Sequence, residues 1–157
     1  MIIICSHCWA ENRSEEVKCC NCGQPLDFNE GSYVSKLINA LHHPLPEVAS
    51  RSAWVLGELH EKRSLVALFE VIVNREDPLI LEAAVEALGK IGDPSAIPIL
   101  TNILKKSYLR VRVAAIEALA NIGTDAAIKI ICGHQYSKIK SVRDASQKAL
   151  FNFKEKQ

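Results

Sequence analysis

The stretch Ile80-Leu-Glu-Ala-Ala-Val-Glu-Ala-Leu-Gly-Lys-Ile-Gly92 recurs 31 positions later as Val111-Arg-Val-Ala-Ala-Ile-Glu-Ala-Leu-Ala-Asn-Ile-Gly123. Small or apolar residues fall at i, i+3, i+4, i+7, i+8 and i+11, which is one stripe of an α-helix and not the alternation of a strand. The pattern continues 31 positions further on and also lies 32 positions earlier. These outer copies contain Val48, Arg51, Ser52, Val55, Leu56 and Leu59, and Val142, Ala145, Ser146, Ala149, Leu150 and Phe153. We therefore predict four helical repeats after residue 32.

The segments between these helices are also in register, which predicts that each repeat is a helical hairpin. Equivalent positions are occupied by Val34, Val66, Ile97 and Ile128. Asp93-Pro94-Ser95 supplies a capping residue and a first-turn proline directly after Gly92. We expect a polar linker over residues 27–32, in which Ser32 caps the first helix. The repeats are expected at about residues 33–60, 64–92, 95–123 and 125–153.

The stretch from Glu82 to Pro94 resembles the short HEAT-like repeats, a type also found in the lyases that attach bilins to phycobiliproteins. The period of 31 or 32 residues is shorter than the roughly 40 to 47 residues of the longer HEAT and armadillo class. Over residues 33–157, the resemblance implies an all-α fold, an α-solenoid of about four helical hairpins. In such a solenoid each repeat packs on its neighbours, and the second helix of every pair lines the concave face.

Five of the six cysteines crowd into residues 5–22, and Cys132 stands apart. Two C-x-x-C pairs, Cys5 with Cys8 and Cys19 with Cys22, flank ten intervening residues. Thiolates from two tight turns can complete the tetrahedron that Zn²⁺ prefers, and four protein ligands are typical of a structural site. About 25 residues bury too little apolar surface to fold alone. We therefore expect a structural zinc bound by these four cysteines to form the core of this head.

Residues 1–26 resemble the short zinc ribbons at the N-termini of many bacterial and archaeal proteins, through Cys8-Trp-Ala-Glu-Asn12 and Cys19-Cys-Asn-Cys22-Gly-Gln-Pro-Leu26. The chain departs from that pattern at Trp9, where such ribbons commonly carry glycine, and at the additional Cys20. Neither departure removes a ligand. The alternatives are a dithiol redox pair, a disulfide knot, or His7 in place of one cysteine ligand.

The composition is that of a globular protein, with 48% hydrophobic and 24% charged residues. No run of about 18 apolar residues is present for a membrane span. The start Met1-Ile-Ile-Ile-Cys5 lacks the basic segment and the length of a signal peptide. We therefore expect a cytoplasmic protein with no membrane partner.

An enzymatic role for the repeats depends on ligands or acid-base groups in the second helices. The iron-dependent deoxyhypusine hydroxylases resemble this repeat type and carry His-Glu pairs early in those helices. The equivalent positions here hold Ser50-Arg51, Glu82-Ala83, Val113-Ala114 and Asp144-Ala145. We therefore expect no catalytic residue. Bilin-lyase-like chemistry, or a chaperone role in chromophore attachment, stays open as an alternative because it has no short motif to test.

The outward positions of the second helices have no role in the core, so they are the candidates for binding a partner. One such position reads Trp54, Glu86, Glu117 and Lys148 in successive repeats, and the position four residues earlier includes Glu82. Neighbouring helices lie roughly 8 to 10 Å apart, which lets two carboxylates contact one partner without sharing a proton. We predict a partner-binding face centred on Trp54, Glu82, Glu86 and Glu117. The alternatives are that the carboxylates only aid solubility and that Trp54 packs against Leu26 or Phe28 of the head.

Charge is distributed unevenly along the chain, although the formal net charge is only +1. Residues 94–157 carry eleven basic and four acidic side chains. A basic ridge is therefore possible at Arg110, Arg112, Lys140 and Arg143, near the turns between paired helices. The basic residues lack interleaved aromatics, so nucleic acid is the second hypothesis. The first is a non-catalytic module that binds or scaffolds an unidentified protein.

Overall fold

The computed structural model describes residues 2–5, 8, 10–13, 15–26, 33–105 and 108–154. The predicted linker 27–32, with Ser32 and Phe28, lies outside the described residues, as do His7, Trp9 and Lys106. Within the described ranges the chain forms a two-stranded head followed by eight α-helices. The predicted all-α solenoid of helical hairpins is therefore confirmed.

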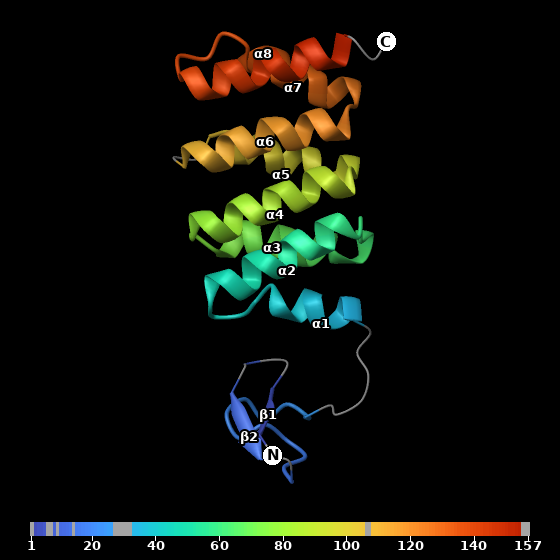
Figure 1. The fold of residues 1–157 in the computed structure, drawn as a ribbon, viewed down its shortest axis with the longest axis vertical. Coiled ribbons are helices and arrows are strands. Elements are labelled where there is room, and N and C mark those ends of the chain that lie inside the picture. Colours follow the sequence, from blue (N-terminus) through green and yellow to red (C-terminus); the bar gives the residue numbers. More distant parts are fainter. Residues whose placement is uncertain are drawn as a thin grey trace.

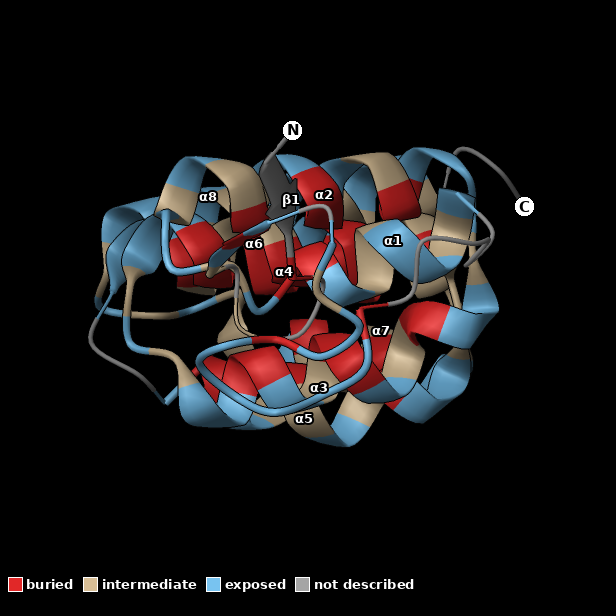
Figure 2. Ribbon diagram, turned by 90° about the horizontal axis from the view of Figure 1, so that it is seen from below, coloured by how far each residue is buried: buried red, intermediate tan, exposed pale blue. Residues whose placement is uncertain are grey.

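The helices pair in chain order, and the pairs stack along the long axis of the molecule (Figure 1). The first helix of each pair contacts the second, and α2, α4, α6 and α8 contact one another in sequence. Viewed along the stack, these second helices form one layer, and α3, α5 and α7 form the other (Figure 2). The bounds are α1 Tyr33–Ala40, α2 Pro46–Glu58, α3 Leu65–Asn74, α4 Pro78–Ile91, α5 Ile97–Ile103, α6 Leu109–Ile122, α7 Asp125–His134 and α8 Lys140–Lys154.

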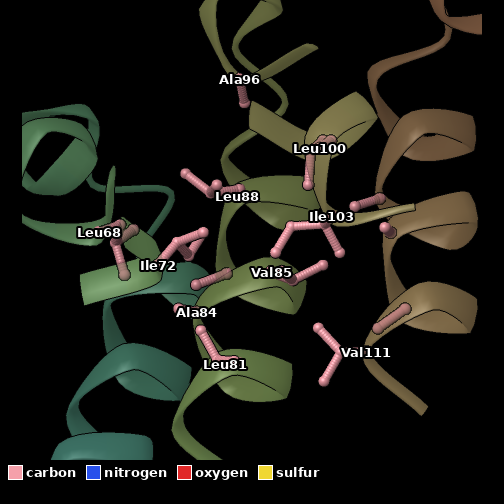
Figure 3. Close-up of a cluster of buried hydrophobic side chains, with 14 of the residues drawn as sticks. Leu68, Ile72, Leu81, Ala84, Val85, Leu88, Ala96, Leu100, Ile103 and Val111 are labelled. Carbon is pink, nitrogen blue, oxygen red and sulfur yellow. The ribbon is translucent and has the colours of Figure 1, made fainter. Parts of the chain in front are cut away.

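The apolar stripes of the two layers meet in one continuous core. Val85 of α4 points toward Ile103 of α5 (Figure 3), and Leu88 and Leu100 belong to the same cluster; all four side chains are buried. Burying a side chain of this kind stabilises a protein by about 1.5–3 kcal/mol. The repeated stripe therefore determines both that the segments are helical and which face each helix buries.

Two glycines set the close spacing of the second helices. A Cβ built on Gly57 would lie 2.8 Å from the Cα of Ala87, and one built on Gly89 would lie 2.6 Å from the Cα of Ala118. Real Cβ atoms do not approach a backbone so closely, so glycine is required at both contacts between helices. The small alanines on the facing helix complete these contacts.

The predicted capping residues lie at the helix boundaries. Gly92 closes α4 with a φ of 71°, the left-handed conformation that favours glycine. Asp93 then accepts a hydrogen bond from the backbone N–H of Ser95, at the start of the short 3₁₀ turn Pro94–Ala96. His60 occupies the position equivalent to Gly92 and also has a positive φ, 49°, with its Nδ1 against the backbone oxygen of Lys90.

The head consists of strands β1, Ile2–Ile4, and β2, Glu11–Arg13, paired antiparallel with Ile3 opposite Asn12. Its small cluster of buried apolar side chains contains Cys5, Cys19 and Leu26 and is separate from the core of the helices. None of the helices in the described part of the chain combines the length and the apolar character that a membrane crossing requires.

Candidate metal centre and second-helix face

The four cysteines of the two C-x-x-C pairs come together at one point of the head. Their sulfur atoms all lie within 4.8 Å of one another, with 3.7 Å between Cys5 and Cys22 and 3.4 Å between Cys8 and Cys19. A tetrahedral zinc with Zn–S bonds of about 2.3 Å has sulfur–sulfur edges of roughly 3.8 Å. The thiol cluster is therefore compatible with a tetrahedral metal site.

Tight turns position the sulfurs. The Cys5 backbone N–H donates to the carbonyl of Ala10 at 3.0 Å, and the Cys19 N–H donates to the carbonyl of Gln24 at 2.8 Å. Gly23 follows Cys22 with a φ of 70°, which lets the second turn close with the Gly23 N–H on the Cys19 carbonyl. Both pairs are thus held by backbone bonds that do not depend on side-chain packing.

Asn12 joins the two turns, and sequence reasoning missed it. Its side chain is buried, donates to the carbonyl of Ala10 at 2.7 Å and accepts from the Cys20 backbone N–H at 2.8 Å. A buried polar side chain with both functions satisfied fixes the geometry around it. The only hint in the sequence is a polar asparagine in the middle of a short strand.

The crowded sulfurs shift one another's pKa values. A hydrogen bond from the Cys22 backbone lowers the pKa of the Cys19 thiol to about 6. For Cys22, the backbone hydrogen bond at Gln24 lowers the pKa, but burial and the thiols of Cys8, Cys19 and Cys5 outweigh it and raise the pKa to about 12. Thiolates this close repel one another, so full ionisation of the cluster requires a cation among them.

The two remaining cysteines stand apart from the cluster. Cys20 and Cys132 are exposed, and none of the six cysteines, all of which lie in the described ranges, forms a disulfide. The Cys20 sulfur donates to the backbone oxygen of Glu11 at 3.6 Å and does not belong to the cluster of four sulfurs. Cys20 therefore provides a matched control for substitution of the neighbouring Cys19.

Trp54 lies on the second-helix face, by which we mean the exposed side of α2, α4, α6 and α8. The residue is 43% exposed. Two cations contact its ring, with Arg51 Cζ 5.2 Å and Lys90 Nζ 5.4 Å from the ring centroid. Lys90 also forms an ion pair with Glu58 at 2.5 Å. Cation–π contacts of this kind contribute about 0.5–1 kcal/mol at exposed sites and hold the indole in one orientation.

The sequence contains a partial signal for this arrangement. Arg51 precedes Trp54 by three residues, a spacing that places both on one side of a helix. Lys90 belongs to the next repeat, and its contact depends on how closely α4 lies against α2. The predicted alternative partner Leu26 is buried in the head's own cluster, and Phe28 lies outside the described residues.

The three predicted carboxylates line one shallow groove of about 230 Å³ across α4 and α6. Glu82, Glu86 and Glu117 share this groove with Arg110, and Val113 and Ala114 are among the small side chains lining it. Arg110 pairs with Glu82, with 3.1 Å between Nη2 and Oε1. The structure thus joins one predicted partner-binding residue to one residue of the predicted basic ridge.

Glu86 is the most perturbed of these carboxylates. Its pKa is raised by burial and by the neighbouring carboxylates Glu82 and Glu117, against the opposing effects of Lys90 and Arg110. When the pKa of a carboxyl group is higher in the folded state than in the unfolded state, the free energy of unfolding is larger with the group protonated than with it ionised. Ionised Glu86 therefore lowers stability at neutral pH.

We expect Glu86→Gln to raise the melting temperature at pH 7. The pKa of Glu86 is higher in the folded state than in the unfolded state. The difference in stability between the variant and the wild type should therefore shrink as the pH falls through the folded-state pKa, and it should vanish below the unfolded-state pKa. Thermal melts followed by circular dichroism at a series of pH values measure this. Glu47→Gln on α2 is a control, because Glu47 is exposed like Glu86 but lies outside the groove that the three carboxylates share. A Glu86→Gln effect that is independent of pH contradicts the electrostatic origin.

The residues of the predicted basic ridge differ in their environments. Arg110 and Lys140 are exposed at the starts of α6 and α8. Arg112 is half-buried, and its buried Nε has no hydrogen-bond partner among the described residues. Arg143 is also half-buried and donates from Nη1 to the carbonyl of Ser137 at 3.2 Å. Only two of the four therefore have fully exposed cationic side chains, and Arg110 is already paired with Glu82.

Fold and site together define a helical-repeat protein with a tetracysteine head. Family models match the chain as HEAT repeats over residues 34–120 and as PBS lyase HEAT-like repeat over residues 111–133. The chain belongs to the HEAT-repeat family. The resemblance of its repeats to the short HEAT-like type is thereby confirmed.

The relatives include enzymes and a designed protein. Deoxyhypusine hydroxylase from Bos taurus is 39% identical over 49 residues, which are 31% of this chain and 16% of that protein. The structure of human deoxyhypusine hydroxylase is similar with a TM-score of 0.68 at 23% identity, over 81% of this chain and 45% of that one. The chain thus spans less than half the length of either relative.

Two further structures share the fold. An engineered protein is similar with a TM-score of 0.58 at 24% identity, over 78% of this chain and 63% of that one. The complex of CpcE and CpcF of phycocyanin lyase from Nostoc sp. PCC7120 is similar with a TM-score of 0.53 at 21% identity, over 83% of this chain and 68% of that one. At these identities the similarity establishes a common solenoid architecture.

Proposed function

We propose that this protein is a non-catalytic protein-interaction module, a short HEAT solenoid whose head is held together by a structural zinc ion. The observation that carries the proposal is the second-helix face. This face carries an exposed tryptophan on α2, oriented by two cations, and a groove across α4 and α6 that is lined by carboxylates. An ordered aromatic next to polar groups is typical of the centre of a protein interface.

Zinc is the metal that best suits the head. Four cysteine sulfurs in a roughly tetrahedral cluster form a closed, soft ligand set, and such a set selects Zn²⁺ over hard cations such as Mg²⁺. With four protein ligands no position is left for a substrate or an activated water. We therefore assign the zinc of Cys5, Cys8, Cys19 and Cys22 a structural role.

The partner of the second-helix face is proposed to be a protein with basic and apolar side chains. Glu86 and Glu117 line the groove without an ion pair to a described residue, so a lysine or arginine of the partner would relieve their mutual repulsion. Trp54 supplies a large apolar area at a small cost in side-chain entropy. Cysteines without disulfides suit a reducing compartment, which supports a cytoplasmic location.

The enzymatic relatives do not change this proposal. In the second helices, the positions where the deoxyhypusine hydroxylases carry His-Glu pairs hold Ser50-Arg51, Glu82-Ala83, Val113-Ala114 and Asp144-Ala145. Glu82 is paired with Arg110. The similarity to phycocyanin lyase is a similarity of fold. Many binding proteins have a solenoid of this kind.

The proposal predicts that Trp54→Ala weakens partner binding by about 2 kcal/mol or more, the loss expected for a hot spot. The measurement is isothermal titration calorimetry with the partner identified by affinity purification. Val66→Ala, at an exposed position of α3 in the other layer, is the matched control and should leave affinity unchanged.

Trp54 also makes contacts within the chain, so stability must be measured in parallel. We expect only a small change in melting temperature, because Trp54 is 43% exposed. A large fall in melting temperature with unchanged affinity of the folded protein would instead assign Trp54 a structural role between α2 and α4.

A further inference from the structure

The outer side of α8 carries an aromatic residue where the earlier repeats have small ones. Phe151 is equivalent to Gly57, Gly89 and Ala120. The two glycines are the points at which α2 and α4 lie against the next second helix. Phe151 therefore projects from the side of α8 through which a repeat contacts its successor, and it is 62% exposed.

The residue one turn earlier on α8 is also changed. Gln147 is equivalent to Val85, which points toward Ile103 and Val111 of the following repeat in Figure 3. Val85 is fully buried, whereas Gln147 is exposed. We call Gln147 and Phe151 the Phe151 face. A further repeat at the spacing of α4 and α6 would clash with the phenyl ring, so this face suits a different partner.

The outer side of α2 has the opposite character. Val48, Val55 and Leu59 are equivalent to Ile80, Ala87 and Ile91, which are at most 7% exposed. Ala87 is the residue that lies beneath Gly57 of the preceding repeat. In the first repeat the equivalent row is uncovered: Leu59 is 50% exposed, and the two valines are half-buried. We call this row the Leu59 face.

Charge distinguishes the two terminal parts of the chain that carry these faces. Residues 1–60 have four basic and seven acidic side chains, whereas residues 125–157 have seven basic and three acidic ones. Opposite net charges attract over about one Debye length, roughly 10 Å at 0.1 M salt, and favour an approach of unlike ends. Arg51, beside the Leu59 face, opposes this attraction locally.

We infer that the Phe151 face of one copy binds the Leu59 face of a second copy, so that the protein associates head-to-tail. The stacked hairpins separate the two faces within one copy (Figure 1), which excludes a contact between them in the same chain. Such an interface is heterologous and extends into a ring or an open chain of copies. It is distinct from the second-helix face and does not depend on the partner proposed for Trp54.

The test compares two single variants of the full-length, zinc-loaded protein. Phe151→Gln changes only the Phe151 face, and Leu59→Lys changes only the Leu59 face. Sedimentation velocity over a range of concentrations measures association of each variant and of the wild type. We expect each variant to weaken self-association about 30-fold, which corresponds to about 2 kcal/mol.

Mixing the two variants distinguishes this arrangement from every symmetric one. Each variant keeps one intact face, and the two intact faces are complementary, so an equimolar mixture is expected to form a dimer that does not grow further. Failure of the mixture to associate while the wild type does associate overturns the inference. A wild-type protein that stays monomeric at every concentration also overturns the inference, regardless of what covers the Leu59 face.

Two controls exclude other causes. Trp54→Ala should leave self-association unchanged, because that side chain lies on the second-helix face. Nuclease treatment should also have no effect. If nuclease abolishes association, nucleic acid bound to the basic C-terminal part links the copies, and the inference is wrong. Melting curves of both variants confirm that they fold.

Discussion

Cys19→Ser is expected to abolish zinc binding and to unfold the head, while most of the helical signal remains. A structural zinc in a small domain contributes about 10–16 kcal/mol at pH 7, and the head's own apolar cluster is far too small to replace it. The helices have their own continuous core, so they do not depend on the ribbon. Elemental analysis gives the zinc content, and amide hydrogen exchange reports unfolding of the head.

Cys20→Ser provides the matched control for this substitution. Cys20 adjoins Cys19 in the chain but is exposed and lies outside the four-sulfur cluster. Its substitution should retain one equivalent of zinc and the protection of the head. Purified wild-type protein with little zinc and with oxidised thiols would contradict the structural-zinc proposal and favour the disulfide alternative.

Gly89→Ala is expected to destabilise the solenoid even though alanine is the better helix former. The added Cβ would lie 2.6 Å from the Cα and 2.8 Å from the Cβ of Ala118, so α4 and α6 must move apart. Overpacking of this kind costs about 1–3 kcal/mol. The gain in helix propensity, about 1 kcal/mol, offsets only part of that cost. Urea unfolding followed by circular dichroism measures the net loss.

Gly133→Ala is the control with the opposite expected sign. Gly133 lies within α7, and a Cβ there would meet nothing within 4 Å. The propensity gain of about 1 kcal/mol is therefore unopposed, and the unfolding midpoint should rise. If both alanine variants shift the midpoint in the same direction, the close contact between α4 and α6 does not limit stability.

The repeated stretch made the solenoid predictable. The stripe of small and apolar residues in each copy is a local pattern of period 3.6, and it determines the helices and their buried faces without reference to distant residues. Turn residues acted in the same local way, because Gly92 and Gly123 both adopt the left-handed conformation that ends a helix. The spacing of the two C-x-x-C pairs likewise identified the four cysteines that the structure brings together.

The environments of the charged and polar side chains depended on distances between repeats, which the sequence does not contain. Arg110 and Arg112 look equivalent as members of a basic segment, yet one is exposed and paired with Glu82 and the other has a buried Nε. The contact of Lys90 with Trp54 requires α4 to lie close to α2, which the missing Cβ of Gly57 permits.

Spacing along the chain was therefore enough to predict the repeat, its helices and the cysteine quartet. The folded structure was needed to see that three carboxylates share a groove, that Asn12 links the two cysteine turns, and that Trp54 lies between two cations. These features depend on hydrogen bonds, ion pairs and desolvation, which change over a few ångströms. At that scale the packing of one repeat on the next sets the geometry.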